Sequence, residues 1–340
     1  MGNKLTFLGP ISPPISGPGV KNEMMLNWLL SNSDLEINII NTQGFKLNAK
    51  LFLSFIKNKI IVLSVSKNGR FLLIPLCFLF RKKVFLFPAG GSFDEEIKSL
   101  PGILKRLFLV STNCIVATYP QTKKLQKGLQ DLKFSNVKYF PNPRFINNYK
   151  AEVKFQDVFR IIFLSKIRET KGPLLLINAL ERVREGNPRI KIYLDFYGLI
   201  DDSFKDKFLN SLSVNAYNKY NGLIQPDEVQ SIISQYNLFV LPTFYKGEGV
   251  PGALLEAMMT GIPIITTDFI GVEELITNNE NGFVIQQNNQ DELVLAINTL
   301  IREEHLRKKF SERVKLKAQE FNINNLMPII VGDLKNDIKR

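Results

Sequence analysis

Short apolar runs alternate with segments of helical periodicity along most of the chain. They predict strands at residues 5–8, 37–41, 60–65, 84–87, 114–117, 137–140, 160–165, 190–196, 238–241, 262–266 and 283–285. Alternation of strands and helices is typical of a parallel sheet covered by helices, so we expect an α/β fold. A Pro/Asn-rich break at residues 140–148 separates two series of runs. For 340 residues this predicts two domains of ordinary size, 1–147 and 148–322.

One stretch of the second series breaks the apolar pattern. A polar loop at residues 246–252 precedes an apolar helical run at 253–259, which Gly261 and Pro263 are expected to end. Glu256 lies inside that run, where a carboxylate is costly unless it is paired or hydrogen-bonded. It either reaches solvent from the first turns of the helix or accepts hydrogen bonds from a ligand. The pattern alone leaves both interpretations open.

The loop before this helix favours a ligand. Gly249 and Gly252 allow the backbone to come close to a bound molecule, and a helix N-terminus offers unpaired N–H groups to an anion. From Glu248 to Met258 the stretch resembles the signature of family 4 retaining glycosyltransferases, Glu-Gly-x-Pro-(Asn/Gly)-x-Leu-x-Glu-Ala-Met. The resemblance implies a GT-B fold, in which two Rossmann-like domains face a cleft and the second holds the nucleotide-sugar. It also implies that residues 323–340 pack back on the first domain.

In that family the paired glutamates of the signature act on the donor. The resemblance therefore implies that Glu248 is the catalytic carboxylate beside the sugar and that Glu256 accepts hydrogen bonds from the ribose hydroxyls. It further implies that the sugar is positioned by the residues that follow Glu248, namely Gly249, Val250, Pro251 and Gly252. Anomeric configuration would be retained without a protein nucleophile, and a phosphate oxygen would take the proton of the acceptor hydroxyl.

Three cations, Lys166, Arg168 and Lys171, follow the strand at 160–165. The family carries Gly-Arg, four residues and Lys-Gly at this place, so the resemblance assigns Lys166 and Lys171 to the diphosphate of the donor. Cleavage of the glycosidic bond leaves negative charge on the β-phosphate, and preorganised positive charge lowers that barrier. Ser165 replaces the family glycine, and Lys166 lacks the bidentate fork of arginine. The alternative is a solvated run of charges in a loop.

A long loop at residues 9–22 follows the first strand and is expected to precede a helix that starts near Glu23. Ligands of open α/β sheets bind at the carboxyl ends of the strands. In the family a glycine pair in this loop faces the donor phosphates. The resemblance implies the same role for Gly17 and Gly19, which are separated here by Pro18. The alternative is an ordinary flexible connection.

Two features depart from what the family or other enzyme classes require. Residues 87–95 resemble the family's His-Gly-Gly segment, but Ala89 stands where a histidine touches the donor sugar. The only histidine, His305, lies in a charged helical segment and is expected at the surface. No Asp-x-Asp, Cys/His metal spacing, Gly-x-Ser-x-Gly or P-loop motif occurs. We therefore expect neither a metal nor a cofactor, with lysines and a helix N-terminus serving the diphosphate.

The net charge of +12 is unevenly placed. Residues 1–150 carry 21 Lys and Arg against 7 Asp and Glu, whereas residues 151–340 carry 23 against 25. Solvated faces could explain the excess, but a bias confined to one half indicates an anionic surface partner. Membrane lipid fits better than nucleic acid, because no nucleic-acid recognition motif occurs. The apolar and basic segment 71–83 is either a core helix with a cationic end or a membrane-surface element.

The remaining features concern the cellular setting. The longest apolar run, residues 71–80, is too short to span a bilayer, and no signal peptide is apparent. Cys77 and Cys114 fall in apolar runs, which predicts buried free thiols in a reducing compartment. We expect a cytoplasmic protein at the inner face of the plasma membrane.

Together these features predict a metal-independent retaining glycosyltransferase. Its donor would be a UDP- or GDP-linked sugar, and its acceptor a lipid-linked or oligosaccharide glycan in bacterial surface polysaccharide synthesis. Two alternatives stay open, a nucleotide-sugar epimerase of the same fold and a non-catalytic partner subunit. The absent histidine supports the partner subunit, whereas the glutamate pair argues against it.

Overall fold

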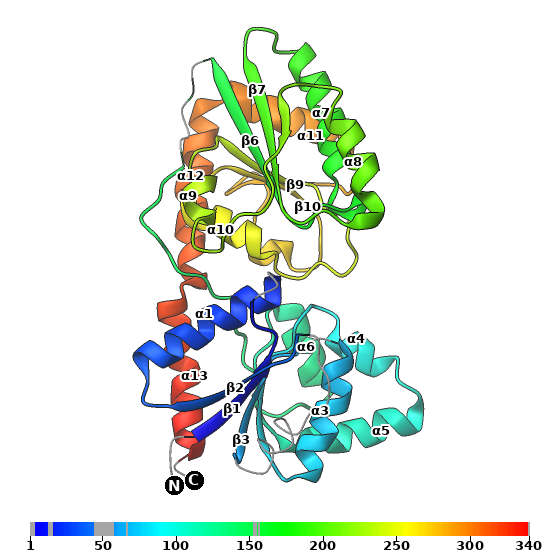
Figure 1. The fold of residues 1–340 in the computed structure, drawn as a ribbon, viewed down its shortest axis with the longest axis vertical. Helices are drawn as coiled ribbons and strands as arrows, with labels where there is room; N and C mark the ends of the chain where they lie inside the picture. The colour runs from blue at the N-terminus through cyan, green and yellow to red at the C-terminus, as the bar shows by residue number, and fades with distance from the viewer. Residues whose placement is uncertain are drawn as a thin grey trace. The chain divides into compact units, whose positions relative to one another are not determined.

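The computed structural model describes residues 4–12, 16–43, 58–65, 67–151, 155 and 157–338. Contacts within the chain define two units. Unit 1 comprises residues 1–145 and 321–340, and unit 2 comprises residues 146–320. Each unit is built on a parallel sheet with helices on its faces, which confirms the predicted α/β class with two Rossmann-like domains (Figure 1).

Unit 1 contains a five-stranded sheet in the order β2-β1-β3-β4-β5, and all neighbouring strands are parallel. Its strands are β1 (Lys4–Gly9), β2 (Glu36–Asn41), β3 (Ile60–Leu63), β4 (Lys83–Leu86) and β5 (Ile115–Thr118). Its helices are α1 (Gly17–Asn32), α3 (Lys67–Leu79), α4 (Phe93–Lys98), α5 (Gly102–Ser111), the short η1 (Thr112–Cys114), α6 (Lys123–Asp131) and α13 (Ile323–Ile338). The order is the one seen in flavodoxin-like sheets, whose ligand site lies where the order reverses.

Alternate residues of these strands enter two different cores. Leu5 and Phe7 of β1 face a core with α1 and α13, whereas Leu8 faces a core with α3, α4, α5 and α6. This follows from the two-residue period of a strand. The last helix, α13, lies beside α1 (red and blue in Figure 1), and the Trp28 indole donates a hydrogen bond to Asn324 Oδ1 at 2.8 Å. Residues at the end of the chain therefore complete unit 1.

Unit 2 contains a six-stranded parallel sheet in the order β11-β10-β9-β6-β7-β8. Its strands are β6 (Val158–Leu164), β7 (Lys191–Tyr197), β8 (Asn218–Tyr220), β9 (Leu238–Leu241), β10 (Ile264–Thr267) and β11 (Phe283–Ile285). Its helices are α7 (Pro173–Glu185), α8 (Lys205–Leu212), α9 (Val229–Ile233), α10 (Gly252–Thr260), α11 (Gln290–Arg302) and α12 (Glu304–Ala318), with short turns η2 (Glu169–Lys171), η3 (Asp202–Phe204), η4 (Val272–Glu274) and η5 (Gln319–Phe321). Counted from β6, this is the strand order of dinucleotide-binding Rossmann domains.

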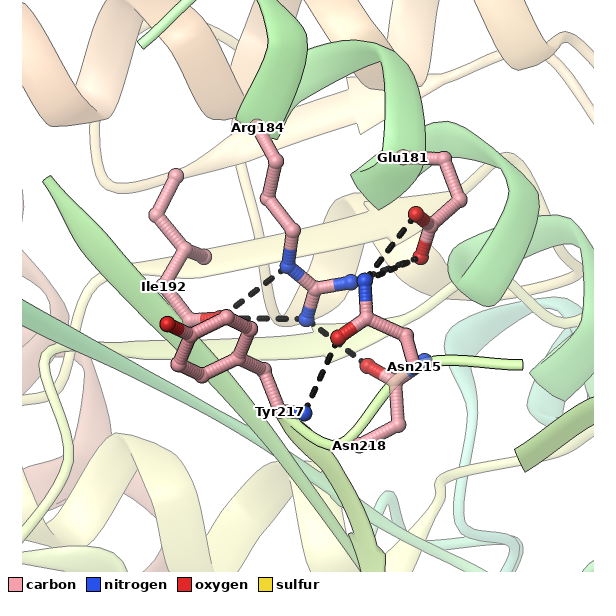
Figure 2. A network of polar contacts seen from close by, with 6 residues as sticks. All are labelled: Glu181, Arg184, Ile192, Asn215, Tyr217 and Asn218. Carbon is pink, nitrogen blue, oxygen red and sulfur yellow. Dashed lines mark hydrogen bonds and ion pairs between the residues drawn. The ribbon is translucent and has the colours of Figure 1, made fainter. Parts of the chain in front are cut away.

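The edge strand β8 was not predicted from the apolar pattern, because its three residues are too few to show one. A polar network fixes it instead (Figure 2). Arg184 at the end of α7 donates to Asn218 Oδ1 at 2.7 Å and to the Ile192 carbonyl at 3.0 Å and 3.1 Å. Its third nitrogen donates to Glu181 at 2.8 Å, and Asn215 donates to the same carboxylate. One guanidinium thus ties α7 to the edge strand β8 and to its neighbour β7.

Two other local predictions were wrong. The first helix starts at Gly17 rather than near Glu23, because the Ser16 hydroxyl accepts a hydrogen bond from the Gly19 N–H and Pro18 lies in the first turn. Residues 137–140 form one isolated bridge, Thr118 with Val137, instead of a strand. Asn136 has a φ of 48°, which interrupts the extended backbone immediately before the run.

Candidate functional site

The strand order of unit 2 reverses between β6 and β9, so the loops after these two strands share one edge of the sheet. In open α/β sheets such a reversal is where ligands bind. The two loops are joined directly: the Phe244 N–H donates to the Thr170 carbonyl at 2.8 Å, and the Thr243 hydroxyl reaches the same oxygen at 3.3 Å. This junction brings the predicted cations and the predicted glutamate into contact.

Gly172 allows the two loops to approach closely. Its φ is 75°, in the left-handed region, and a Cβ at this position would lie 2.2 Å from the Pro242 carbonyl oxygen. Pro173 then begins α7. Lys171 is therefore held immediately before α7, because the residue that follows it has a backbone conformation and a close contact that only glycine allows.

Lys171 and Glu248, predicted as separate donor contacts, form an ion pair through Glu248 Oε2. The Thr243 hydroxyl donates to the same oxygen at 2.8 Å. Both charged side chains are buried, 8 % exposed each. Burial lowers the pKa of Lys171, and the Glu248 carboxylate acts in the opposite direction. Glu248 Oε1 accepts no hydrogen bond from the described residues, so one carboxylate oxygen stays available to a ligand.

Arg168 and Tyr245 complete this group, and sequence reasoning assigned them no role. The guanidinium carbon of Arg168 lies 3.8 Å from the centroid of the Tyr245 ring, and Lys171 Nζ lies 5.4 Å from the same centroid. Arg168 Nε is buried and has no hydrogen-bond acceptor among the described residues. Since Lys171 is neutralised by Glu248, Arg168 gives the group its net positive charge. The three-residue spacing of Arg168 and Lys171 across a tight turn was the signal available in the sequence.

Lys166 is placed differently from Lys171. It is about half exposed and pairs with Asp201 at 2.8 Å, not with Glu248. Its hydrogen bond holds the pKa of Asp201 below the usual value. The structure therefore brings Lys171 and Glu248 together and leaves Lys166 at the surface of the same loop.

The predicted glycine-rich loop leads into α10 as expected. Val250 and Pro251 are buried, Gly249 and Gly252 are half-buried, and no side chain of the described residues caps the first N–H groups of α10. These N–H groups can therefore bind an anion. Gly261 ends the helix with a φ of 72°, which confirms the predicted helix stop.

Glu256 does not reach solvent from this helix. It is 6 % exposed, and its Oε2 accepts a hydrogen bond from Gln230 Nε2 of α9 at 2.8 Å. Gln230 in turn accepts from the Asn147 N–H at 3.2 Å. The carboxylate is thus held in a buried polar network between α9 and α10.

In unit 1, Gly17 and Gly19 lie in the first turn of α1, where the loops after β1 and β3 meet. Asn22 of the same helix donates to the Pro10 carbonyl at 2.9 Å and accepts from the Ser64 hydroxyl at 2.7 Å. Lys21 is 3 % exposed and makes no ion pair with a described residue. Its burial lowers its pKa to about 7, and Arg144 adds to the shift.

Ala89, at the family's histidine position, offers only its backbone. Its carbonyl accepts a hydrogen bond from Arg70 at 2.9 Å, and Arg70 also pairs with Glu96.

His305 is exposed, as expected, and Cys77 and Cys114 are free thiols, the first buried and the second half-buried. Within the described residues, no helix has the length and apolar character needed to cross a bilayer.

Comparison with known proteins shows to which family the chain belongs. The family model of glycosyl transferases group 1 matches residues 145–317, about half of the chain. The chain belongs to this family. An uncharacterised glycosyltransferase of Haemophilus influenzae is 29% identical over 223 residues, which are 65% of this chain and 61% of that protein. The poly(glycerol-phosphate) alpha-glucosyltransferase of Bacillus subtilis is 26% identical over 177 residues, 50% of this chain and 24% of that one. The chain thus spans less than two thirds of the length of these relatives.

Solved structures are similar over the whole chain. HepE of Anabaena in complex with UDP has a TM-score of 0.76 at 16% identity, covering 98% of this chain and 100% of that one. A glycosyltransferase from Rickettsia africae has a TM-score of 0.75 at 17% identity, covering 99% and 100%. At these identities the likeness concerns the fold, and it agrees with the two Rossmann-like units of this group 1 family member.

Proposed function

We propose that the protein is a retaining glycosyltransferase that moves a sugar from a UDP- or GDP-linked donor to a lipid-linked glycan in surface polysaccharide synthesis. The observation that supports it best is the buried Lys171–Glu248 pair at the strand-order reversal of unit 2, beside an uncapped helix N-terminus. Relatives named as a poly(glycerol-phosphate) alpha-glucosyltransferase and as glycosyltransferases of amylovoran and colanic acid biosynthesis support the polysaccharide setting.

The described residues suggest how each part of a donor would be held. Lys171 and the net positive charge of Arg168, with the N–H groups of Gly252 and Ala253, would hold the diphosphate. Lys166 would add a weaker contact from the surface. In unit 1 the Gly19 N–H already donates to the Ser16 hydroxyl, so this proposal gives Gly17 and Gly19, in the first turn of α1, no contact with the diphosphate. Glu256 would accept hydrogen bonds from the ribose.

The chemistry needs no metal in this proposal. The bond between the anomeric carbon and the β-phosphate oxygen breaks, and the acceptor hydroxyl forms a bond to that carbon on the same face. Its proton passes to an oxygen of the departing diphosphate. Lys171 and Arg168 would stabilise the charge that develops on the diphosphate, and Glu248 the positive charge that develops at the sugar.

Calorimetry with UDP and GDP, followed by slow hydrolysis of a panel of nucleotide-sugars, tests the proposal. Lys171→Ala should lower the affinity for the preferred diphosphate by roughly 10- to 100-fold, the scale of 1.5–3 kcal/mol for a charged hydrogen bond. Lys219→Ala, at an exposed lysine of β8, is the matched control and should bind normally. Hydrolysis should persist in a chelator.

Three outcomes separate the alternatives. Release of a sugar whose C2 configuration has changed indicates the epimerase. Diphosphate binding without turnover of any donor indicates the non-catalytic partner subunit. Binding that is unchanged in Lys171→Ala removes the assignment of this site.

A further inference from the structure

Helix α5 of unit 1 exposes most of its apolar side chains. Ile103, Leu104, Leu107 and Val110 are 77 %, 55 %, 64 % and 53 % exposed, and only Phe108 and Ser111 of this helix are buried. The four exposed residues follow the spacing of one helical face. We call this set the α5 ridge. Scattered exposed leucines are normal on protein surfaces, but an entire apolar face left in water indicates an interaction site.

A second exposed apolar group lies at the end of the neighbouring helix. Phe78, Leu79 and Phe80 at the end of α3 are all exposed. The two helices pack together through Phe71 and Phe108, whose ring centroids are 4.7 Å apart. The ridge and the end of α3 therefore belong to the same layer of helices, on one face of the sheet of unit 1.

The chain segments that carry these two apolar groups are basic. No acidic residue occurs between Glu36 and Asp94 or between Glu96 and Asp131, while basic residues are frequent in both intervals. Arg106 and Arg81 are exposed and make no ion pair with a described residue. Arg81 has a φ of 50° and ends α3, with the Lys82 N–H donating to the Cys77 carbonyl at 2.8 Å. Cations thus flank both exposed apolar groups.

We propose that the α5 ridge docks on an anionic lipid bilayer, with its apolar side chains in the interface and Arg81 and Arg106 at the headgroups. Apolar side chains flanked by cations on one surface are what a helix lying in the membrane plane requires. A second copy of the chain fits less well, since two such basic surfaces repel each other. A ten-residue helix is also only about 15 Å long, whereas a stable dimer needs roughly 800 Å² per partner.

The inference rests on the proposed function only for its purpose, which is to bring unit 1 to a lipid-linked acceptor. Its test uses no sugar donor. Failure of vesicle binding would therefore leave the glycosyltransferase proposal standing, and failure of donor hydrolysis would leave the docking surface standing.

Flotation of the full chain with lipid vesicles tests the ridge. The wild type should bind vesicles of equimolar phosphatidylcholine and phosphatidylglycerol and bind phosphatidylcholine alone poorly. The double substitution Leu104→Ser with Leu107→Ser should lower the partition coefficient by about 100-fold, tenfold for each side chain removed from the interface. The matched control is Leu295→Ser with Leu316→Ser, two exposed leucines of unit 2, and it should bind as the wild type does. Equal losses in both pairs would overturn the proposal.

A charge variant separates lipid binding from misfolding. Arg81→Gly removes a cation from a left-handed position that glycine favours, so the melting temperature should stay or rise while binding to anionic vesicles falls about fivefold. Arg302→Ser, at an exposed cation of α11, is the control. Vesicle binding that is changed neither by Arg81→Gly nor by added salt would contradict the assignment of an anionic lipid surface as the partner.

Insertion of the ridge can be measured with Leu107→Trp. Trp28, the chain's only tryptophan, is buried and supplies a constant background. On anionic vesicles the new indole should shift to shorter wavelength and be quenched by lipids with brominated chains. An indole that does not shift would overturn the proposal. Dimerisation without lipid, if the double substitution Leu104→Ser with Leu107→Ser abolishes it, would assign the ridge to self-association instead.

Discussion

Helices α5 and α10 are similar in length and apolar content but differ in what covers them. In α10 every residue from Leu254 to Thr260 is buried, and α9 and α12 pack against this helix. In α5 only Phe108 and Ser111 are buried, because α3 covers one side alone. An apolar helix is therefore no sign of a core by itself.

The charged residues of the two units differ in the same way. Lys171 of unit 2 is buried against a carboxylate, whereas Lys21 of unit 1 is buried without one. Arg81 and Arg106 of unit 1 are exposed beside apolar side chains. In unit 2 the buried lysine is paired beside a candidate ligand site, whereas unit 1 buries one lysine without a carboxylate and exposes two arginines beside apolar side chains.

The largest expected effect concerns the two helices directly. Leu255→Ala in α10 removes a side chain with no exposed surface and should reduce the free energy of unfolding by about 2–5 kcal/mol. Leu107→Ala in α5 should change it by less than about 0.5 kcal/mol. Denaturant titration of both variants measures this. Similar losses would mean that the α5 ridge is covered in solution.

The two buried lysines should respond with opposite signs. Lys21→Met should raise the free energy of unfolding at pH 7 by roughly 2–4 kcal/mol, since a cation without a carboxylate is removed from the interior. Lys171→Met should lower it, because Glu248 would be left buried and unpaired.

The pH dependence of Lys21 sharpens this test. Its folded pKa is about 7 against an ordinary value of 10.5, so the unfolded chain binds more protons between these values and the stability of the wild type rises with pH there. The advantage of Lys21→Met should be complete below pH 7 and vanish as pH approaches 10.5. Thermal melts of the wild type and Lys21→Met at pH values of about 6, 8 and 10 measure this dependence. An advantage independent of pH would show that packing, not charge, is responsible.

Glu248→Gln tests whether the polar network of unit 2 serves chemistry. The amide keeps the shape but not the charge, so kcat should fall by roughly 10- to 1000-fold, the scale of one electrostatic contact in the transition state. Glu273→Gln, at an exposed glutamate, is the control. Full kcat in Glu248→Gln would make the loop a structural turn.

The smallest effect is expected at Glu256. Glu256→Gln can still accept a hydrogen bond from Gln230, so the fold should be unaffected. Weaker acceptance from the ribose should raise KM for the donor by about threefold to tenfold with kcat nearly unchanged, because ribose contacts are alike in the ground and transition states. Steady-state kinetics with saturating acceptor measures both constants, and an unchanged KM would assign Glu256 to the α9–α10 network alone.

Much of the fold was predictable because it depends on local patterns. Apolar runs placed ten strands within a few residues of their observed positions, and the glycine and proline after α10 ended it where expected. The errors occurred where individual polar residues, and not apolar periodicity, determine the local structure. Ser16 starts α1 early, Asn136 interrupts residues 137–140, and Arg184 holds a three-residue strand that no period could show.

The sequence by itself determined the α/β class, the apolar helix that carries Glu256 and the two loops that carry the candidate site, since these follow from periodicity and backbone stereochemistry. Only the tertiary structure decided that Lys171, and not Lys166, meets Glu248, 77 positions away, and that Arg168 lies on Tyr245. It also decided that α10 is covered and α5 is not. The reason is physical: pairing and burial depend on which distant segments the strand order brings to one edge or face of a sheet, and no local pattern records that order.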